Sequence, residues 1–257
     1  MGVVNITPDS FSDGGKFLAA DAAIAQARRL VEEGAAILDL GAESTRPGAH
    51  PVGEDEEIAR LMPVLEAVRG VGVPISIDTR RARVMREVLA AGASMINDIE
   101  ALAGPGSLEA VAGSGCGVCL MHMQGTPATM QAEPHYRDVV GEVSAFLAVR
   151  VAAAESAGIS RDRIVVDPGF GFGKTTAHNL ELLRSLEAVA GLGVPVLAGL
   201  SRKSMLGAIT GRPAQDRMAA SVAAALLAAQ RGATILRVHD VAATRDALAV
   251  WRAVEAL

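Results

Sequence analysis

Acidic and amide side chains recur where short apolar runs of this sequence end, and cationic side chains follow the later runs. The acids and amides are Asn5, Asp39, Asp78, Asn97, Asp98 and Asp167, with His122 among them, and the cations are Arg202, Lys203, Arg237 and His239, with Ser201 beside them. A carboxylate accepts hydrogen bonds at two coplanar oxygens and an amide both donates and accepts, which matches the edge of an aminopyrimidinone ring. Arg and Lys bind phosphate groups. These residue types predict a site that holds a heterocycle on one side and a phosphate on the other.

For these side chains to share one site, the apolar runs that precede them must lie side by side. Three junctions are nearly copies of one another: GAAILD at 34–39, GASMIN at 92–97 and GATILR at 232–237. A glycine that stops a helix, followed by a short apolar run, indicates a strand buried on both faces. Strands are expected at 3–5, 36–40, 75–78, 94–98, 118–122, 164–167, 196–199 and 234–238. Helical patterns separate them, including one with Asp21 as its N-cap and a longer one over 136–158.

Eight strands that alternate with helices favour an α/β fold, a (β/α)8 TIM barrel, built as a single domain over residues 1–257. An open doubly wound sheet is the second choice, because no glycine-rich dinucleotide turn follows the first strand. In a TIM barrel the active site lies at the C-terminal ends of the strands, so the polar residues would meet at one mouth. The alternative for Lys203 and Arg237 is that they only neutralise neighbouring acids.

The composition excludes several classes of protein. A formal net charge of −5 gives no basic field for nucleic acid. The longest apolar stretch, 218–229, is too short to span a bilayer, and the N-terminus shows no secretory leader. We therefore expect a cytoplasmic protein that binds neither membrane nor nucleic acid.

Two motifs are interpreted without a special function. Cys116 and Cys119 form a C-x-x-C at the start of a strand-like run, so we expect buried small residues and not a redox or zinc pair. The segment PGFGFGKT at 168–175 resembles a phosphate-binding P-loop, but it has Pro168 where the first glycine is needed. Nucleotide hydrolysis is therefore rejected.

The expected mouth loops share a distinctive composition. Segments 7–15 and 41–48 are rich in Gly, Pro and hydroxyl residues, which favours mobile covers over the site. Four of the five Phe residues fall in expected mouth loops: Phe11, Phe17, Phe170 and Phe172. Aromatic rings in loops are expected to stack on a flat ligand.

Seven of these segments together resemble the dihydropteroate synthase family over essentially the whole chain. They are MGVVNITPDSFSDGG at 1–15, ESTRPG at 43–48, DT at 78–79, ND at 97–98, DPGFGF at 167–172, SRK at 201–203 and RVH at 237–239. The resemblance implies an enzyme that joins para-aminobenzoate to 6-hydroxymethyl-7,8-dihydropterin diphosphate. The products would be 7,8-dihydropteroate, a folate precursor, and pyrophosphate, and sulfonamides would inhibit by imitating the aminobenzoate.

The resemblance also implies roles for residues of this sequence. Asp78, Asn97, Asp167 and Lys203 would hold the pterin with Thr45 nearby, Arg237 and His239 would hold the diphosphate, and Arg46, Pro47, Phe172, Ser201 and Lys203 would frame the aminobenzoate. Lys203, Arg237, His239, Asp78 and Asp167 would be the catalytic residues. Asn5 would ligate Mg²⁺, a cation that prefers oxygen ligands and substrate phosphates. The family further implies a homodimer, for which residues 218–230 offer an Ala-rich surface. It also implies a short segment before the first strand that this sequence lacks, so we expect a less closed barrel floor.

Two other functions are kept as alternatives. A pterin-binding methyltransferase barrel would share the pterin-holding acids, but it has no need of Lys203, Arg237 and His239 around a diphosphate. An inactive paralogue that binds pterin would differ only in activity, although both mouth loops are retained in this sequence.

Overall fold

The structure is a computed structural model that describes residues 1–6, 15–44 and 52–256 of the chain. The sheet contains eight parallel strands in the order in which they occur along the chain. They are β1 (Gly2–Asn5), β2 (Leu38–Gly41), β3 (Ile75–Asp78), β4 (Met95–Asp98), β5 (Gly117–Met121), β6 (Ile164–Asp167), β7 (Val196–Ala198) and β8 (Ala233–Leu236). All eight expected strands are present.

The last strand returns to the first. Val3 N donates a hydrogen bond to Val238 O at 3.0 Å, and Val238 N donates to Met1 O at 2.9 Å. Met1 also packs against the residues of the sheet interior. The sheet therefore closes into a barrel, which confirms the expected TIM barrel and excludes the open doubly wound sheet.

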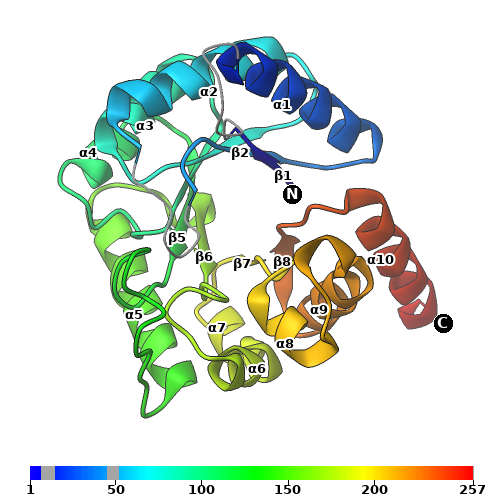
Figure 1. Cartoon of the computed structure of the whole chain (residues 1–257). Helices are drawn as coiled ribbons and strands as arrows, with labels where there is room; N and C mark the ends of the chain where they lie inside the picture. The colour runs from blue at the N-terminus through cyan, green and yellow to red at the C-terminus, as the bar shows by residue number, and fades with distance from the viewer. Residues whose placement is uncertain (7–14, 45–51, 257) are drawn as a thin grey trace.

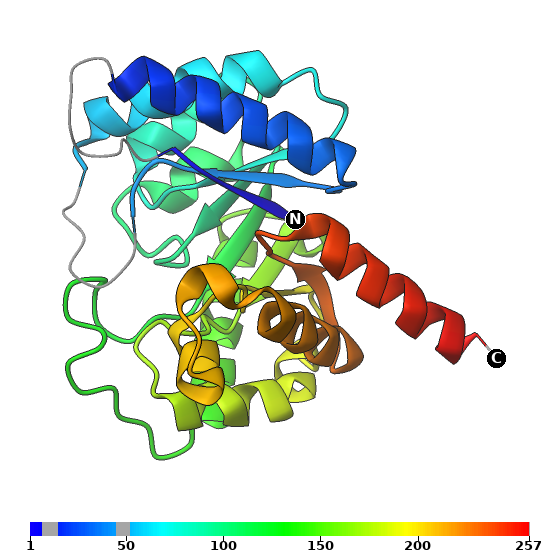
Figure 2. The same ribbon diagram turned by 45° about the vertical axis from the view of Figure 1, so that its right-hand side comes forward.

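Helices follow the strands and surround the sheet (Figure 1). They are α1 (Gly15–Glu32), α2 (Glu54–Val68), α3 (Ala82–Ala90), α4 (Ser107–Ala112), α5 (Val139–Ser156), α6 (Thr176–Arg184), α7 (Leu186–Ala190), α8 (Ser204–Thr210), α9 (Met218–Gln230) and α10 (Val241–Glu255). The final helix, α10, extends away from the barrel towards the C-terminus (Figure 2). None of the helices in the described ranges is long and apolar enough to cross a membrane.

Two helix predictions are corrected in detail. Asp21 is not an N-cap, because α1 already begins at Gly15 and Asp21 lies inside it. The helix expected over 136–158 is shorter, since α5 begins after Asp138, whose side chain accepts a hydrogen bond from Gly141 N. That bond satisfies one of the free amides of the first turn and fixes where the helix starts.

Side chains alternate between two apolar environments along each strand, as the period of two requires. One set contacts the surrounding helices and forms the larger core, which includes Leu40, Ile77, Ile96, Leu120 and Val166. The other set forms a small cluster inside the barrel: Met95, Cys119, Val165 and Leu197, with Met1 and Ile235 packed against it. Both Cys116 and Cys119 are buried, as expected, and neither forms a disulfide. The inward-facing position nearest the C-terminal end of each strand is left for the mouth.

Asp98 is a structural residue of the turn after β4. Its position next to the inward-facing Asn97 places it on the helix-facing side, and it is fully buried. Its carboxylate accepts hydrogen bonds from Glu100 N at 2.8 Å and Leu102 N at 2.9 Å. Ala101 and Leu102 both have left-handed φ angles, of 53° and 57°, which residues other than glycine rarely adopt. The Asp98 carboxylate therefore stabilises a strained turn directly after Asn97, and its placement at the mouth is wrong.

Replacing Asp98 with Asn is expected to destabilise the fold in a pH-dependent way. An amide has one acceptor oxygen, so one of the two turn amides loses its partner, at a cost of about 1–3 kcal/mol. Burial raises the pKa of Asp98 from 3.8 to about 7, so between these values the folded protein holds a proton that the unfolded chain has released. The contribution of Asp98 is therefore greatest near pH 4 and declines as the pH rises to 7.

Urea unfolding of the wild type and Asp98→Asn between pH 4 and 8 measures this difference. The gap in unfolding free energy should narrow as the pH rises. Asp138→Asn is the matched control, because Asp138 caps an exposed helix end where Asn is an equally good cap. A gap for Asp98→Asn that stays constant or widens with pH would contradict the assignment.

Candidate active site

The inward-facing residues at the C-terminal ends of the strands form the mouth of the barrel. They are Asn5, Gly41, Asp78, Asn97, Met121, Asp167, Gly199 and Arg237. Two of the eight are glycines that stand beside acids. A Cβ atom at Gly41 would lie 3.7 Å from Asp78 Oδ2, and one at Gly199 would lie 3.9 Å from Asp167 Oδ2. The acids therefore border positions without a side chain, which leaves width for a flat ligand.

Arg237 is paired with acids from two other strands. Its Nε donates to Asp39 Oδ2 at 2.6 Å, and one terminal nitrogen donates to Asp78 Oδ2 at 3.1 Å. Asn97 Nδ2 lies 3.3 Å from the same Asp39 oxygen, so the amide and the guanidinium share one buried acceptor. Asp39 is fully buried below the mouth. Arg237 therefore does neutralise neighbouring acids in this structure.

Burial sets the protonation of Asp78. It raises the pKa of this carboxyl from 3.8 to about 7, while the positive charge of Arg237 opposes the rise. A guanidinium has five N–H groups, and the bonds to Asp39 and Asp78 use two of them. Arg237 can therefore neutralise its acids and still donate to a further anion.

A second pair of opposite charges lies across the mouth. Asp167 Oδ1 accepts a hydrogen bond from Gly169 N at 2.7 Å, and burial raises the pKa of Asp167. Burial lowers the pKa of Lys203 to about 8, and the charge of Asp167 opposes that shift. Lys203 Nζ lies 4.1 Å from the centre of the Phe172 ring, within the range of a cation–π contact. The structure thus brings together an acid, a cation and an aromatic face.

Ser201 and His239 meet where β7 and β8 end. His239 N donates to Ser201 Oγ at 3.2 Å, and His239 Nδ1 lies 2.9 Å from the same hydroxyl. Between Ser201 and Lys203, Arg202 has a left-handed φ of 60° and forms an ion pair with Asp240 at 2.7 Å. Arg202 therefore pairs with Asp240, while Ser201 pairs with His239.

Some expected site residues lie outside what the structure describes. These are Thr45, Arg46, Pro47 and Phe11, together with the side chain of Phe17, and most of the two loops expected to cover the site. Asn5 is described, and its exposed side chain stands at the end of β1. The described residues contain no group of three or more His, Cys, Asp or Glu that could hold a metal ion.

Two residues expected at the mouth are found elsewhere. Phe170 belongs to the larger core and is 1% exposed. His122 follows the inward-facing Met121 and so lies on the helix side, where its ring meets that of Phe146 edge-on at 4.9 Å. Burial, with a smaller effect from Lys174, lowers the pKa of His122 to about 3. Neither ring is placed to contact a ligand in the mouth, so both placements are wrong.

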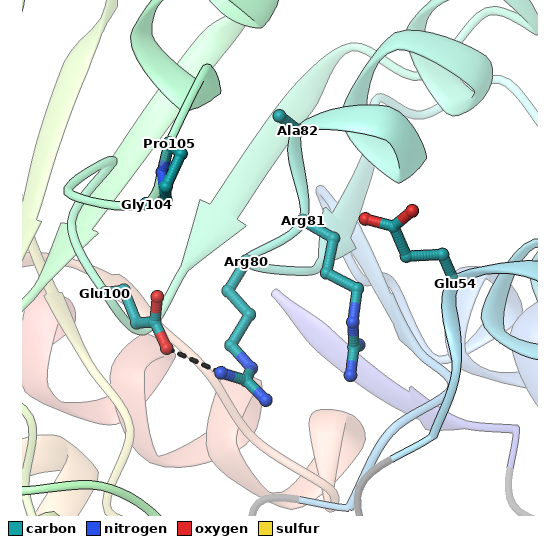
Figure 3. A pocket seen from close by; sticks show the side chains of 7 residues that line it. All are labelled: Glu54, Arg80, Arg81, Ala82, Glu100, Gly104 and Pro105. Atoms are coloured by element: carbon teal, nitrogen blue, oxygen red, sulfur yellow. Dashed lines mark hydrogen bonds and ion pairs between the residues drawn. The ribbon is translucent and has the colours of Figure 1, made fainter.

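An ionic network beside the mouth was not expected from the sequence. Arg81 pairs with the buried Glu57 and with Glu43 at 2.6 Å, and also donates to Val52 O at 2.5 Å. Arg80 pairs with Glu100 at 2.7 Å. A cavity of about 350 Å³ adjoins these arginines (Figure 3), lined by Glu54, Arg80, Arg81, Ala82, Glu100, Gly104 and Pro105. Because acids already neutralise both arginines, the described lining of this cavity has no unmatched positive charge with which to hold an anion.

Comparison with known proteins relates this geometry to a family. Residues 1–239 match the family described as pterin binding enzyme. The chain is 52% identical over 254 residues to the dihydropteroate synthase of Haemophilus influenzae, covering 98% of this chain and 92% of that protein. It is 55% identical over 258 residues to the dihydropteroate synthase of Neisseria meningitidis serogroup C, covering 98% and 91%.

Solved structures agree in fold. The dihydropteroate synthase of Xanthomonas albilineans with 4-aminobenzoic acid has a TM-score of 0.94 and 57% identity, covering 100% of this chain and 93% of that one. The same enzyme in complex with 7,8-dihydropteroate has a TM-score of 0.88 and 50% identity, covering 100% and 92%. The dihydropteroate synthase of Yersinia pestis in a sulfonamide drug complex has a TM-score of 0.94 and 46% identity, covering 100% and 94%.

The pairing of Arg237 with two acids predicts a strong dependence of stability on this residue. Arg237→Met leaves Asp39 and Asp78 without their cation, and breaking a buried pair in this way costs about 3 kcal/mol. Adding Asp39→Asn should recover part of the loss, since one stranded carboxylate is removed.

The matched control is Arg202→Met, because the Arg202–Asp240 pair is more exposed and should contribute less than about 1 kcal/mol. Thermal and urea unfolding at pH 7.5 measure all three variants. Equal losses of unfolding free energy for Arg237→Met and Arg202→Met would show that the buried pairs of Arg237 contribute no more to stability than the more exposed Arg202–Asp240 pair.

Proposed function

Because the chain belongs to the dihydropteroate synthase family of pterin-binding enzymes, we propose that its reaction takes place at the barrel mouth described above. The protein is a transferase that condenses para-aminobenzoate with 6-hydroxymethyl-7,8-dihydropterin diphosphate to give 7,8-dihydropteroate and pyrophosphate. Identity of 52–55% over 98% of the chain is the observation that carries this conclusion. Sulfonamide drugs, which are bound in a relative's structure, are the corresponding inhibitors.

The pterin is assigned to the acids and amide that face inward. Asp78, Asn97 and Asp167 stand at the ends of β3, β4 and β6, where two oxygens per carboxylate can accept from ring N–H groups. The glycine positions beside Asp78 and Asp167 supply the space for a planar ring. Donation from the ring favours the ionised carboxylates, which offsets part of the effect of burial on their pKa.

The diphosphate is assigned to the cations at β7 and β8. Arg237, with three N–H groups beyond its bonds to Asp39 and Asp78, lies next in the chain to the turn that carries His239. Together with Lys203 these groups would stabilise the negative charge that develops on the leaving group. The C–O bond to the diphosphate breaks, the aminobenzoate nitrogen forms the new C–N bond, and that nitrogen loses a proton. The pterin ring electrons and nearby carboxylates stabilise the cation that forms when the C–O bond breaks ahead of attack.

Magnesium is assigned to the same side of the mouth. The exposed Asn5 amide is the ligand offered by the described residues, so the diphosphate and water would complete the shell, as Mg²⁺ commonly requires. When bound, the ion would neutralise charge on the leaving diphosphate. The donor set fits a hard cation that arrives with the substrate, and not a preformed metal cage.

The aminobenzoate is assigned to the surface formed by Phe172, Ser201 and Lys203, with Arg46 and Pro47 contributed by the segment at 45–51. The Phe172 ring held near Lys203 supports this placement, because a benzoate presents both a flat face and a negative charge. A sulfonamide analogue would use the same contacts.

The two alternatives differ from this function in what the mouth must do. A methyltransferase barrel has no use for Lys203, Arg237 and His239 grouped at one side, so this grouping favours the synthase. An inactive paralogue would bind the pterin but would release no pyrophosphate, so an activity assay distinguishes it from the synthase. The homodimer, with α9 at its interface, and the cytoplasmic location stay predictions from the sequence.

Pyrophosphate should be released only when both substrates and Mg²⁺ are present. The coupled assay compares the complete mixture with mixtures that lack aminobenzoate, pterin diphosphate or Mg²⁺. Activity should also disappear when EDTA is added and return with excess Mg²⁺. Saturating substrates that give no pyrophosphate would refute the function, and full activity in EDTA would refute the magnesium assignment.

Replacing Phe172 with Leu should act on one substrate only. Loss of the aromatic face should raise the Michaelis constant for aminobenzoate about tenfold, while affinity for the pterin stays the same. Phe146→Leu is the matched control, because this ring lies on the helix side against His122. A change in pterin affinity with an unchanged constant for aminobenzoate would place Phe172 on the other side of the site.

A further inference from the structure

Lys174 is a buried lysine for which the chemistry above has no use. It ends the loop between β6 and α6 and is 3% exposed. Its Nζ lies 2.9 Å from His122 Nδ1 and donates to the carbonyl oxygens of Gly169 and Phe172, both at 3.0 Å. The carbonyl oxygen of His122 lies at 3.4 Å. An ammonium has three N–H donors and no acceptor, and the atoms around Nζ are all able to accept hydrogen bonds.

The charges around Lys174 fix the direction of these bonds. Burial lowers the pKa of His122 to about 3, so its ring is neutral and Nδ1 accepts the hydrogen bond from Lys174. Burial also lowers the pKa of Lys174 to about 7, with Asp167 opposing that shift and Lys203 adding to it. The other atoms in contact with Lys174 Nζ are carbonyl oxygens, which only accept, so the lysine is the donor in each of these bonds.

The loop that Lys174 holds lies directly on the backbone that follows β5. Gly169, Gly171 and Gly173 have left-handed φ angles of 70°, 80° and 62°. A Cβ atom at Gly169 would lie 1.8 Å from His122 O, and one at Gly173 would lie 2.4 Å from Gln124 O. No side chain fits between the two segments at these points. The loop is therefore packed closely against the segment that follows β5.

The hydrogen bonds from Lys174 hold the backbone at and before Phe172, the residue whose ring lies at the mouth. Gly169 O accepts from Phe172 N at 3.1 Å as well as from Lys174, and the Phe172 carbonyl accepts from Lys174 directly. On the other side of Phe172, the ring lies over Lys203 Nζ. One buried ammonium thus fixes the backbone of Phe172 while Lys203 contacts its side chain.

We propose that Lys174 is a positioning residue for the aminobenzoate side of the site, which acts by holding the Gly169 and Phe172 carbonyls so that the Phe172 ring stays against Lys203. The proposal rests on the proposed function, which places aminobenzoate beside Phe172. It predicts an effect mainly on one substrate, because Asp78 and Asn97, which are assigned to the pterin, lie on β3 and β4, outside the loop that Lys174 holds.

Lys174→Met removes the donors and keeps an apolar chain of similar length. Its Michaelis constant for aminobenzoate should rise about tenfold, with pterin affinity by calorimetry changed less than about twofold. Tyr136→Phe is the matched control, since it removes a different bond to the same loop, from Tyr136 Oη to Gly173 O at 2.9 Å. The control should leave both constants unchanged. Equal effects of the two variants, or an equal loss of pterin affinity, would overturn the proposal.

A double-mutant cycle tests whether Lys174 acts through Phe172. In the Phe172→Leu background, Lys174→Met should change the constant for aminobenzoate less than about twofold, because the ring that it positions is already absent. Lys174→Gln, which keeps neutral N–H donors, should recover part of the loss in the wild-type background. Additive effects would overturn the proposal, as would failure of both Lys174 variants to fold.

Amide hydrogen exchange supplies a readout that does not depend on activity. In Lys174→Met the peptide that spans residues 168–174 should exchange faster, while peptides from β3 and β4 keep their wild-type protection. Unchanged exchange at 168–174 would overturn the role of Lys174 in holding the loop. A wild-type protein that releases no pyrophosphate would instead overturn the proposed function, so the two failures are distinguishable.

Discussion

The hydrogen bonds between residues 1–3 and 236–238 are the constraint on which the mouth depends. They bring β8 beside β1 and so place Arg237 within reach of Asp39 and Asp78, which lie 198 and 159 residues earlier in the chain. An open sheet would leave these side chains at opposite edges. Closure therefore creates the electrostatic centre of the site as well as the fold, and a single guanidinium then links β8 to β2 and β3.

Closing the barrel also concentrates charge where water is scarce. Asp78 and Asp167 have raised pKa values, and that of Lys203 is lowered to about 8, in each case chiefly through burial. Partners offset part of the cost of burying these acids, because Asp78 accepts a hydrogen bond from Arg237 and Asp167 accepts one from Gly169 N. Asp78 and Lys203, with pKa values of about 7 and about 8, can change charge when a ligand binds, which is common among functional residues.

The sequence was sufficient to predict the architecture because each element had a local signal. The strands Ile75–Asp78 and Ile164–Asp167 were predicted with their observed bounds, since each is a short apolar segment ended by an acid. Other bounds shifted by one or two residues, as at β2, where the apolar pattern begins before the hydrogen bonds do. The family was also predictable, because seven motifs occur in the same order over the whole chain.

The direction of side chains was harder to predict than the elements that carry them. Asp98 and His122 each follow an inward-facing residue, so a shift of one position separates the mouth from the helix side. The sequence of Phe170 and its neighbours does not distinguish a ring in the core from a ring at the mouth. The path of the loop after β6 decides this, and it buries the ring in the larger core. Lys174 gave no signal beyond its place after three alternating glycines, because its partners depend on how the loop packs on the β5 segment.

Arg237 has a consequence for how the two ends of a substrate are related. Its guanidinium contacts Asp78, which the proposed mode assigns to the pterin, and it is itself assigned to the diphosphate. A diphosphate that accepts from the remaining N–H groups of Arg237 would offset part of the positive charge that lowers the pKa of Asp78, and so would raise that pKa. Binding at one end therefore alters affinity at the other by the same factor in both directions. The ion pair makes the heterocycle and its leaving group thermodynamically linked, although no residue needs to touch both.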